Sequence, residues 1–301
     1  MSEYSAQNRL SIRCYNFFVR KLLLSLLKKA FTRNIFVNLI HKLEVYANKS
    51  LYASLGIEDL EDLIFQMNPR FISSEHLIRK GNQFDGGYVI CNKITSGSTY
   101  LLSLGVGDNI TFETDLNTDL AHTIFVDHSI LALPCPLPNS TFINKKVSTI
   151  AGFKTINLQE CLDMIPNNVD AILKIDIEGS EWDSLANLEL TELSRFTQIV
   201  GEFHNFHGIY QHEHLIKILN TLKKINKTHV NVNLHPNNWS NFKIINGIAI
   251  PDVVELTFIR KDLFDSLTDQ KTGNVIHYGV NDLNTPNNPR SPEYRLCFFN
   301  H

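Results

Sequence analysis

The sequence predicts an α/β fold in which helices cover both faces of a mostly parallel sheet. Short apolar runs alternate with helical segments between about residues 100 and 260, which is the pattern of repeated strand–helix–strand units. Runs such as residues 171–175 are largely apolar over their whole length, as strands buried on both faces are. A turn with two glycines, Gly105 and Gly107, joins one of these runs to a helical segment.

The elements follow one another in a regular order. We expect strands at residues 100–104, 123–126, 142–147, 171–175, 198–201, 229–234 and 253–260. Helices are expected from about residue 110 and at residues 158–164, 181–188 and 212–225. Residues 1–65 should form a helical extension and residues 66–301 the α/β domain. The tail after about residue 278 is rich in Asn and Pro and should be irregular.

The net charge of −3 conceals an asymmetry along the chain. Residues 1–49 carry nine Lys or Arg and two Glu, a net charge of +7, so the remainder carries −10. The uncharged stretch in FFVRKLLLSLLKKAF is too short to span a bilayer, and no cleavage site of small residues follows it. Two interpretations stay open. The favoured one is a helical cap on the main domain, and the other is a basic amphipathic helix on an anionic membrane.

Composition narrows the class of protein and its compartment. With 43% hydrophobic and 20% charged residues the chain is globular. The five cysteines are scattered and form no CxxC pair, which argues against a zinc ribbon or a disulfide framework. We therefore expect a cytoplasmic protein, with membrane contact only through its basic N-terminal segment, and no nucleic-acid partner.

The glycine turn is the first functional signal. In YLLSLGVGDNITFE, Gly105 and Gly107 permit a tight turn and a close approach of a ligand to the backbone. Asp127 ends the next strand 22 residues after Gly105, a spacing that suits an acid on the ribose of an adenosine. Asp108 would repel a pyrophosphate, and Ile110 occupies the third glycine position of a dinucleotide motif. S-adenosylmethionine is therefore favoured over NAD.

Several segments resemble a known family. LSLGVGDNITFE, FVDHS and ILKIDIEGSEW, in that order and preceded by FDGGYVI, resemble FkbM-type methyltransferases over roughly residues 75–260. The resemblance implies a Rossmann-like class I methyltransferase fold with a seven-stranded sheet and an antiparallel last strand. It also implies S-adenosylmethionine as cofactor and O-methylation, often of sugars or glycans. Spacing and resemblance together give the expected cofactor site: Gly105, Val106, Gly107, Asp108, Glu113, Asp127, His128 and Asp176.

One departure from the family pattern concerns the methionine end of the cofactor. Many members of the family have an acid where this chain has Ser103. Glu113 or Asp85 could replace that acid and bind the amino group.

Carboxylates and a histidine mark the expected reaction site. Asp176 and Glu178, in KIDIEGSEW, are two residues apart and can point the same way beyond a strand end. Glu202 and His204, in IVGEFHNFHG, have the same spacing on the next strand. We expect all four to converge as catalytic groups, with His204 as general base. A divalent metal bound by Asp176, Glu202 and His204 is a second, slightly less favoured use.

Two further segments have local interpretations. Ser180-x-x-Asp183 resembles a capping box, and Glu181 can complement the dipole of the helix that starts there. HPNNWS offers His235 and Asn238, with Asp85 from FDGGYVI, as candidates for sugar recognition. An Asx-rich turn is an equally good reading of HPNNWS.

The sequence thus predicts an S-adenosylmethionine-dependent O-methyltransferase. Its acceptor would be a hydroxyl of a sugar, a nucleotide-sugar or a glycan. Two alternatives stay open: an NAD-dependent oxidoreductase, and a non-catalytic adapter that docks on a membrane or on glycan-assembly machinery.

Overall fold

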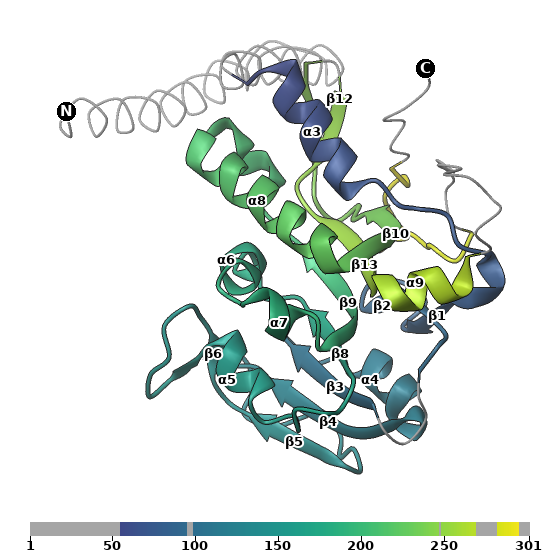
Figure 1. The fold of residues 1–301 in the computed structure, drawn as a ribbon, viewed down its shortest axis with the longest axis vertical. Helices are drawn as coiled ribbons and strands as arrows, with labels where there is room; N and C mark the ends of the chain where they lie inside the picture. Colours follow the sequence, from purple (N-terminus) through teal and green to yellow (C-terminus); the bar gives the residue numbers. More distant parts are fainter. Residues whose placement is uncertain (1–54, 95–98, 247, 269–281, 295–301) are drawn as a thin grey trace, which may run out of the picture. The chain divides into compact units, whose positions relative to one another are not determined.

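The computed structural model describes residues 55–94, 99–246, 248–268 and 282–294 (Figure 1). These residues belong to one compact unit, Ser54–His301. Its first helix, α3 (Ile57–Met67), spans the boundary expected at residue 65 and buries one apolar face. The basic segment 1–49 lies outside the described residues, so its role as a cap or a membrane-binding helix stays a prediction.

A seven-stranded sheet forms the centre of this unit. Its order is β10 (His229–Pro236), β13 (Val254–Arg260), β9 (Phe196–Phe203), β8 (Ala171–Ile175), β3 (Thr99–Leu104), β4 (Leu120–Val126) and β5 (Ser140–Ile143). β13 runs antiparallel to both of its neighbours, and the remaining neighbouring pairs are parallel. The predicted mostly parallel seven-stranded sheet with an antiparallel last strand is confirmed.

Helices cover both faces of the sheet, as predicted (Figure 1). On one side α8 (His212–Thr228) packs against α3, α6 (Glu181–Ala186) and α7 (Leu190–Leu193). On the other side lie α4 (Thr111–Leu116) and α9 (Lys261–Leu267). α5 (Leu158–Leu162) precedes β8 and begins with a capping box between Asn157 and Glu160. Among the described residues, no helix is both long and apolar enough to cross a bilayer.

A hairpin that the sequence analysis did not predict lies over the sheet. It consists of β1 (Leu77–Gly81) and β2 (Gly87–Cys91), and β2 contacts β9 and β13. The side-chain amide of Gln198 accepts from the backbone N–H of Cys91 and donates to its carbonyl, both at 2.9 Å. These paired bonds imitate those of a neighbouring strand, and they fix the FDGGY segment above the sheet.

Two other regions differ from the prediction. The strand expected at residues 142–147 is divided: β5 ends at Ile143, and β6 (Lys146–Val147) pairs instead with β7 (Thr155–Ile156). The amide of Asn144 donates to the carbonyls of Asp127 and Ile130, and this turns the chain between the two strands. A second hairpin, β11 (Phe242–Ile245) with β12 (Ile248–Pro251), follows β10. Residues 282–294 form neither helix nor strand, as predicted.

Candidate active site

Three neighbouring strands end at one edge of the sheet and bring the predicted groups together. Leu104 at the end of β3 pairs with Ile175 at the end of β8, which pairs with Gly201 in β9. The glycine turn, Asp176 and the Glu202–His204 segment therefore follow adjacent positions. Parallel strands place their carboxyl ends, and the ligands bound there, along a common edge.

His204 lies at the centre of a group of carboxylates. Its Nε2 is 3.6 Å from an oxygen of Glu178, 3.8 Å from Glu202 and 3.9 Å from Asp176. The predicted convergence of these four residues is present in the structure. The imidazole is mostly buried, whereas the side chain of Glu178 is 88% exposed. Glu178 adopts a left-handed backbone conformation with φ 57°.

Glu181 has a role that the sequence analysis missed. It is fully buried, and its Oε1 accepts from the backbone N–H groups of Ile177 and Gly179 at 2.9 and 3.1 Å. The same oxygen lies 3.1 Å from His204 Nδ1. Glu181 does lie in the first turn of α6, as predicted, but it also binds two backbone N–H groups and His204, because a buried carboxylate needs such donors. The predicted capping box is absent, since Ser180 makes no side-chain cap bond.

Opposing effects set the pKa of His204. Burial by itself lowers the pKa of the imidazole. The hydrogen bond and charge of Glu181, with the charges of Asp176 and Glu178, outweigh burial and raise that pKa. Because Glu181 fixes the Nδ1 side of the ring, Nε2 is directed at the other three carboxylates.

Tyr88, from the FDGGY segment, completes the surroundings of Asp176. Its hydroxyl donates to Oδ2 of Asp176 at 3.3 Å, and its ring packs edge-on against Phe112 with centroids 5.3 Å apart. Burial, followed by the charge of Asp176, raises the pKa of the phenol well above its usual value, so the hydroxyl keeps its proton. The sequence analysis assigned candidate roles to Asp85 of FDGGY but none to its tyrosine.

Glu202 lies in surroundings that disfavour its ionised form. Its pKa is raised well above the usual range, first by burial and then by the charges of Asp176 and Glu255. Glu255 lies directly opposite Glu202 in the antiparallel pair β13–β9. The amide of Asn237 donates to Glu202 at 3.0 Å. Glu202, beside His204, therefore binds its proton more tightly than an ordinary carboxyl group does.

The glycine turn is closed on one side and open on the other. Gly105 has φ 73°, and a Cβ there would lie 1.7 Å from the carbonyl oxygen of Asp176. Gly107 has φ 59°, and a Cβ there would meet nothing within 4 Å. The ammonium group of buried Lys174 donates to the carbonyl of Gly105. The turn is therefore tightly packed against the protein at Gly105, while at Gly107 it has room for a ligand.

Asp127 binds the backbone of this turn. Its Oδ2 accepts from the N–H groups of Val106 and Gly107 at 2.7 and 2.8 Å, and its Oδ1 accepts two bonds from Ser129. These bonds outweigh burial and lower the pKa of the carboxyl to about 2. All four acceptor positions of the carboxylate are occupied by the protein. A ribose hydroxyl would have to displace Ser129, so the direct role of Asp127 here is to hold the turn.

The other predicted cofactor residues surround the turn. Asp108 and His128 are exposed beside it. Ser103 and Glu113 are fully buried, and the Ser103 hydroxyl donates to Oε1 of Glu113 at 2.5 Å. Oε2 of Glu113 has no hydrogen-bond partner among the described residues. Glu113 therefore places a carboxylate directly beside the position where the family pattern has its acid.

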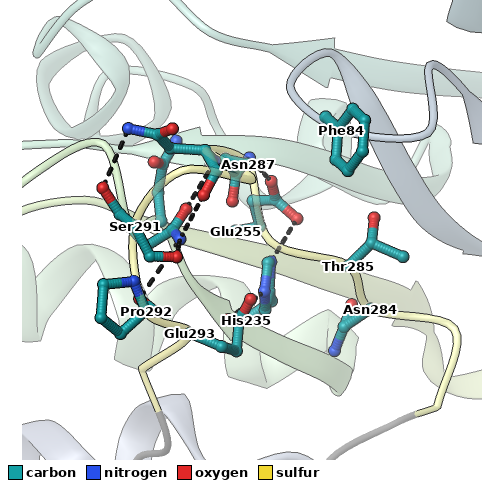
Figure 2. Close-up of polar contacts among 12 residues, drawn as sticks. Phe84, His235, Glu255, Asn284, Thr285, Asn287, Ser291, Pro292 and Glu293 are labelled. Atoms are coloured by element: carbon teal, nitrogen blue, oxygen red, sulfur yellow. Dashed lines mark hydrogen bonds and ion pairs between the residues drawn. The ribbon is translucent and has the colours of Figure 1, made fainter.

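Two of the three predicted substrate residues serve another purpose. His235 is buried between Glu255, at 3.0 Å, and Glu293, at 2.9 Å (Figure 2). Asn238 donates to the carbonyls of Asn288, Ser291 and Pro292 and accepts from the N–H of Asn288. Both side chains anchor residues 284–293, so their assignment to sugar contact was wrong. Asp85 is exposed on the β1–β2 loop.

Residues 47–241 match the methyltransferase FkbM domain. The chain belongs to the FkbM methyltransferase family. The strand order of the sheet and its antiparallel last strand agree with the Rossmann-like methyltransferase fold that the sequence resemblance implied. A comparison with curated proteins finds no match.

Similarity to solved structures is weak. A fibrillarin/Nop5p complex aligns with TM-score 0.35 and 12% identity over 55% of this chain and 73% of that one. A Plasmodium falciparum dimethyladenosine transferase aligns with TM-score 0.33 and 12% identity over 71% and 64%. A Streptococcus mutans protein in complex with SAH aligns with TM-score 0.30 and 12% identity over 56% and 90%.

Proposed function

We propose that this FkbM family member is an S-adenosylmethionine-dependent O-methyltransferase that acts on a hydroxyl of a sugar, a nucleotide-sugar or a glycan. The observation that carries the proposal is the pair His204–Glu181, which lies with Asp176 beside the open glycine turn. An oriented imidazole next to carboxylates is what removal of a hydroxyl proton requires.

The cofactor fits the residues around the turn. When bound, S-adenosylmethionine supplies a methyl group on a positively charged sulfur. The open side of Gly107 gives a ligand access to the backbone, and buried Glu113 offers an unpaired carboxylate oxygen that suits an ammonium group. Exposed Asp108 disfavours a pyrophosphate at this turn, which argues against an NAD-dependent oxidoreductase.

Each residue of the site would have its own role in the reaction. His204 Nε2 accepts the proton of the acceptor hydroxyl, while Glu181 holds Nδ1 and stabilises the imidazolium that results. Asp176, oriented by Tyr88, places a negative charge beside the reacting groups. Glu202, whose pKa is raised, can in its protonated form donate a hydrogen bond to the acceptor oxygen.

A divalent metal is the alternative use of this site, with Glu181 in the place that the sequence analysis gave to Glu202. One oxygen each from Asp176 and Glu181 and one nitrogen of His204 lie within 4.8 Å of one another. These residues would suit Mg²⁺ or Mn²⁺, which could lower the pKa of a bound hydroxyl. Treatment with EDTA separates the two mechanisms. If His204 acts as a base, EDTA leaves the activity unchanged. If the residues bind a metal, EDTA abolishes the activity until Mg²⁺ or Mn²⁺ is added back.

The experiment that tests the function measures binding and turnover separately. Calorimetry with S-adenosylmethionine and with NADH should show binding of the former alone. Transfer of a labelled methyl group to methyl glycosides, nucleotide-sugars or extracted polysaccharide should then follow. Asp176→Asn should lower the rate of transfer by about a hundredfold or more while S-adenosylmethionine still binds. Binding without transfer to any of these acceptors would favour the non-catalytic adapter, and binding of NADH alone would favour the oxidoreductase.

A further inference from the structure

Residues 128–157, which connect Asp127 at the end of β4 to α5, differ in charge from the rest of the domain. They contain no Asp or Glu, whereas residues 50–301 as a whole carry a net charge of −10. The cationic side chains of the stretch are Lys145, Lys146 and Lys154. The two flanking acids bind backbone N–H groups, Asp127 those of the glycine turn and Glu160 that of Asn157 at 3.3 Å. The stretch is therefore a basic segment on an acidic domain.

The same stretch carries the most exposed large apolar side chains of the described residues. Leu131, Ile150 and Phe153 are 91%, 76% and 94% exposed, and every other large apolar side chain in that part of the chain is at most 62% exposed. Single exposed apolar residues are common on protein surfaces, but a group of them marks an interaction surface. Here the group coincides with the three lysines.

Hydrogen bonds make the two exposed loops of this stretch neighbours. The amide of Asn144 donates to the carbonyl of Ile130, next to Leu131, at 2.6 Å. The ammonium group of Lys145, the following residue, donates to the carbonyl that precedes Phe153, at 3.4 Å. Both loops therefore lie at the edge of the sheet that β5 forms.

The loop that carries Ile150 and Phe153 connects β6 to β7. The backbone N–H of Lys146 donates to the carbonyl of Lys154 at 3.0 Å, which closes the loop at its base. In Figure 1 this loop extends outward beside β6 and α5. Its apolar side chains thus lie at the tip, and two exposed lysines lie at the base.

This composition favours a lipid bilayer over a protein partner. Residues 128–157 contain no Arg, Trp or Tyr, the residues that contribute most to the affinity of protein interfaces. Lysine is depleted in such interfaces. At a bilayer, lysine attracts anionic headgroups while apolar side chains enter the boundary between headgroups and acyl chains. Lysine ion pairs among the described residues involve only Lys217 and Lys223, so the lysines of this stretch are available to lipid phosphates.

We propose that the loops of Leu131 and Phe153, with Lys146 and Lys154, dock the protein on an anionic phospholipid bilayer. The inference goes beyond the proposed function and does not depend on it. Asn144, which links the two loops, also donates to the carbonyl of Asp127 at 3.1 Å. The docking surface therefore adjoins the strand end that holds the glycine turn.

The test measures cosedimentation of the full-length protein with vesicles. Phosphatidylcholine vesicles are compared with vesicles that also contain about 30% phosphatidylserine. The wild type should bind the anionic vesicles at least about tenfold more tightly, and added salt should weaken this binding.

Two double variants then separate the apolar from the charged contribution. Ile150→Ser with Phe153→Ser should weaken binding to the anionic vesicles by about tenfold or more, because no large apolar side chain is left at the loop tip. Lys146→Gln with Lys154→Gln should weaken it by a similar factor, because two charges near the headgroups are lost. All four side chains are exposed, so the thermal unfolding of both variants should match that of the wild type.

Matched controls make the same changes elsewhere on the surface. Phe65→Ser removes an exposed phenylalanine from α3, a helix rich in acids. Lys227→Gln with Lys261→Gln removes two exposed lysines from α8 and α9. Both controls should bind the anionic vesicles as the wild type does.

Three outcomes overturn the inference. One is a wild-type protein that binds neither kind of vesicle. Another is equal binding by the wild type and both loop variants, which would leave the basic segment 1–49 as the membrane contact. The third is a dimer that forms without lipid in analytical sedimentation and is lost in the Ile150→Ser, Phe153→Ser variant, because the surface would then bind a second copy of the chain.

Discussion

Replacing Asp127 by Asn should destabilise the protein in a pH-dependent manner, because the carboxylate accepts four hydrogen bonds from the glycine turn and from Ser129. A fall of its pKa from 3.8 to about 2 corresponds to roughly 2.5 kcal/mol of preference for the ionised form. Part of the carboxylate is within reach of solvent, so screening reduces this value. We therefore expect Asp127→Asn to lower the free energy of unfolding by about 1–2 kcal/mol.

The pH dependence follows from the direction of the shift. A carboxyl whose pKa is lowered by folding contributes its stability above the unfolded pKa and loses it as the pH falls toward the folded value. The difference in the free energy of unfolding between the wild type and Asp127→Asn should therefore be constant from about pH 7 to pH 5. It should narrow below about pH 4, as the wild-type carboxyl itself becomes protonated.

Urea denaturation followed by tryptophan fluorescence at pH 7, 5, 4 and 3 measures this difference. Asp108→Asn is the control, because it removes the same charge from an exposed position on the same turn. Its midpoint should match that of the wild type. The reasoning is refuted if the two variants have equal midpoints at pH 7, or if the loss in Asp127→Asn is the same at pH 3 as at pH 7.

Three further outcomes follow from the site. Gly105→Ala should destabilise by more than about 3 kcal/mol in thermal unfolding, because its Cβ would lie 1.7 Å from a carbonyl oxygen. Gly107→Ala should lower the free energy of unfolding by only about 1–2 kcal/mol and should weaken cofactor binding in calorimetry. Equal losses of stability in the two variants would contradict the conclusion that the turn is open at Gly107. His204→Gln should remove the acidic limb of the pH–rate profile. In the wild type that limb should lie above the usual histidine range, because its pKa is raised, and Glu181→Gln should move it to lower pH. Asp176→Asn should fold normally and lower kcat by about a hundredfold or more, since it removes the charge beside the reacting groups; near-wild-type turnover would place the reaction elsewhere.

Much of the sheet could be predicted from sequence because its strands are buried on both faces. All five residues of β8 are buried, and they match the expected range without error. Burial on two sides produces a continuous apolar run that is visible without any partner strand. The β1–β2 hairpin was missed because its pairing to the sheet depends on Gln198 and Thr257, which are distant in sequence.

The convergence of Asp176, Glu178, Glu202 and His204 was also readable from sequence. Side chains two residues apart project to the same side of an extended chain, and parallel strands that are neighbours end at a common edge. Spacing and strand order were sufficient for that inference. They were insufficient for the pKa values, because the raised pKa values of Glu202 and His204 depend on burial and on neighbours from other parts of the chain.

Tertiary structure alone decided which polar residues hold the site and which face a ligand. Glu181 looked like a helix-start residue, but folding buries it completely, and it must then share its oxygen with two N–H groups and His204. His235 looked free to bind a sugar, and instead it pairs with Glu255 and Glu293. Sequence determines where polar groups occur along a strand or turn, since that is local. The partner that satisfies each buried group comes from a distant part of the chain, because a buried polar atom must bond to whatever the fold brings within reach.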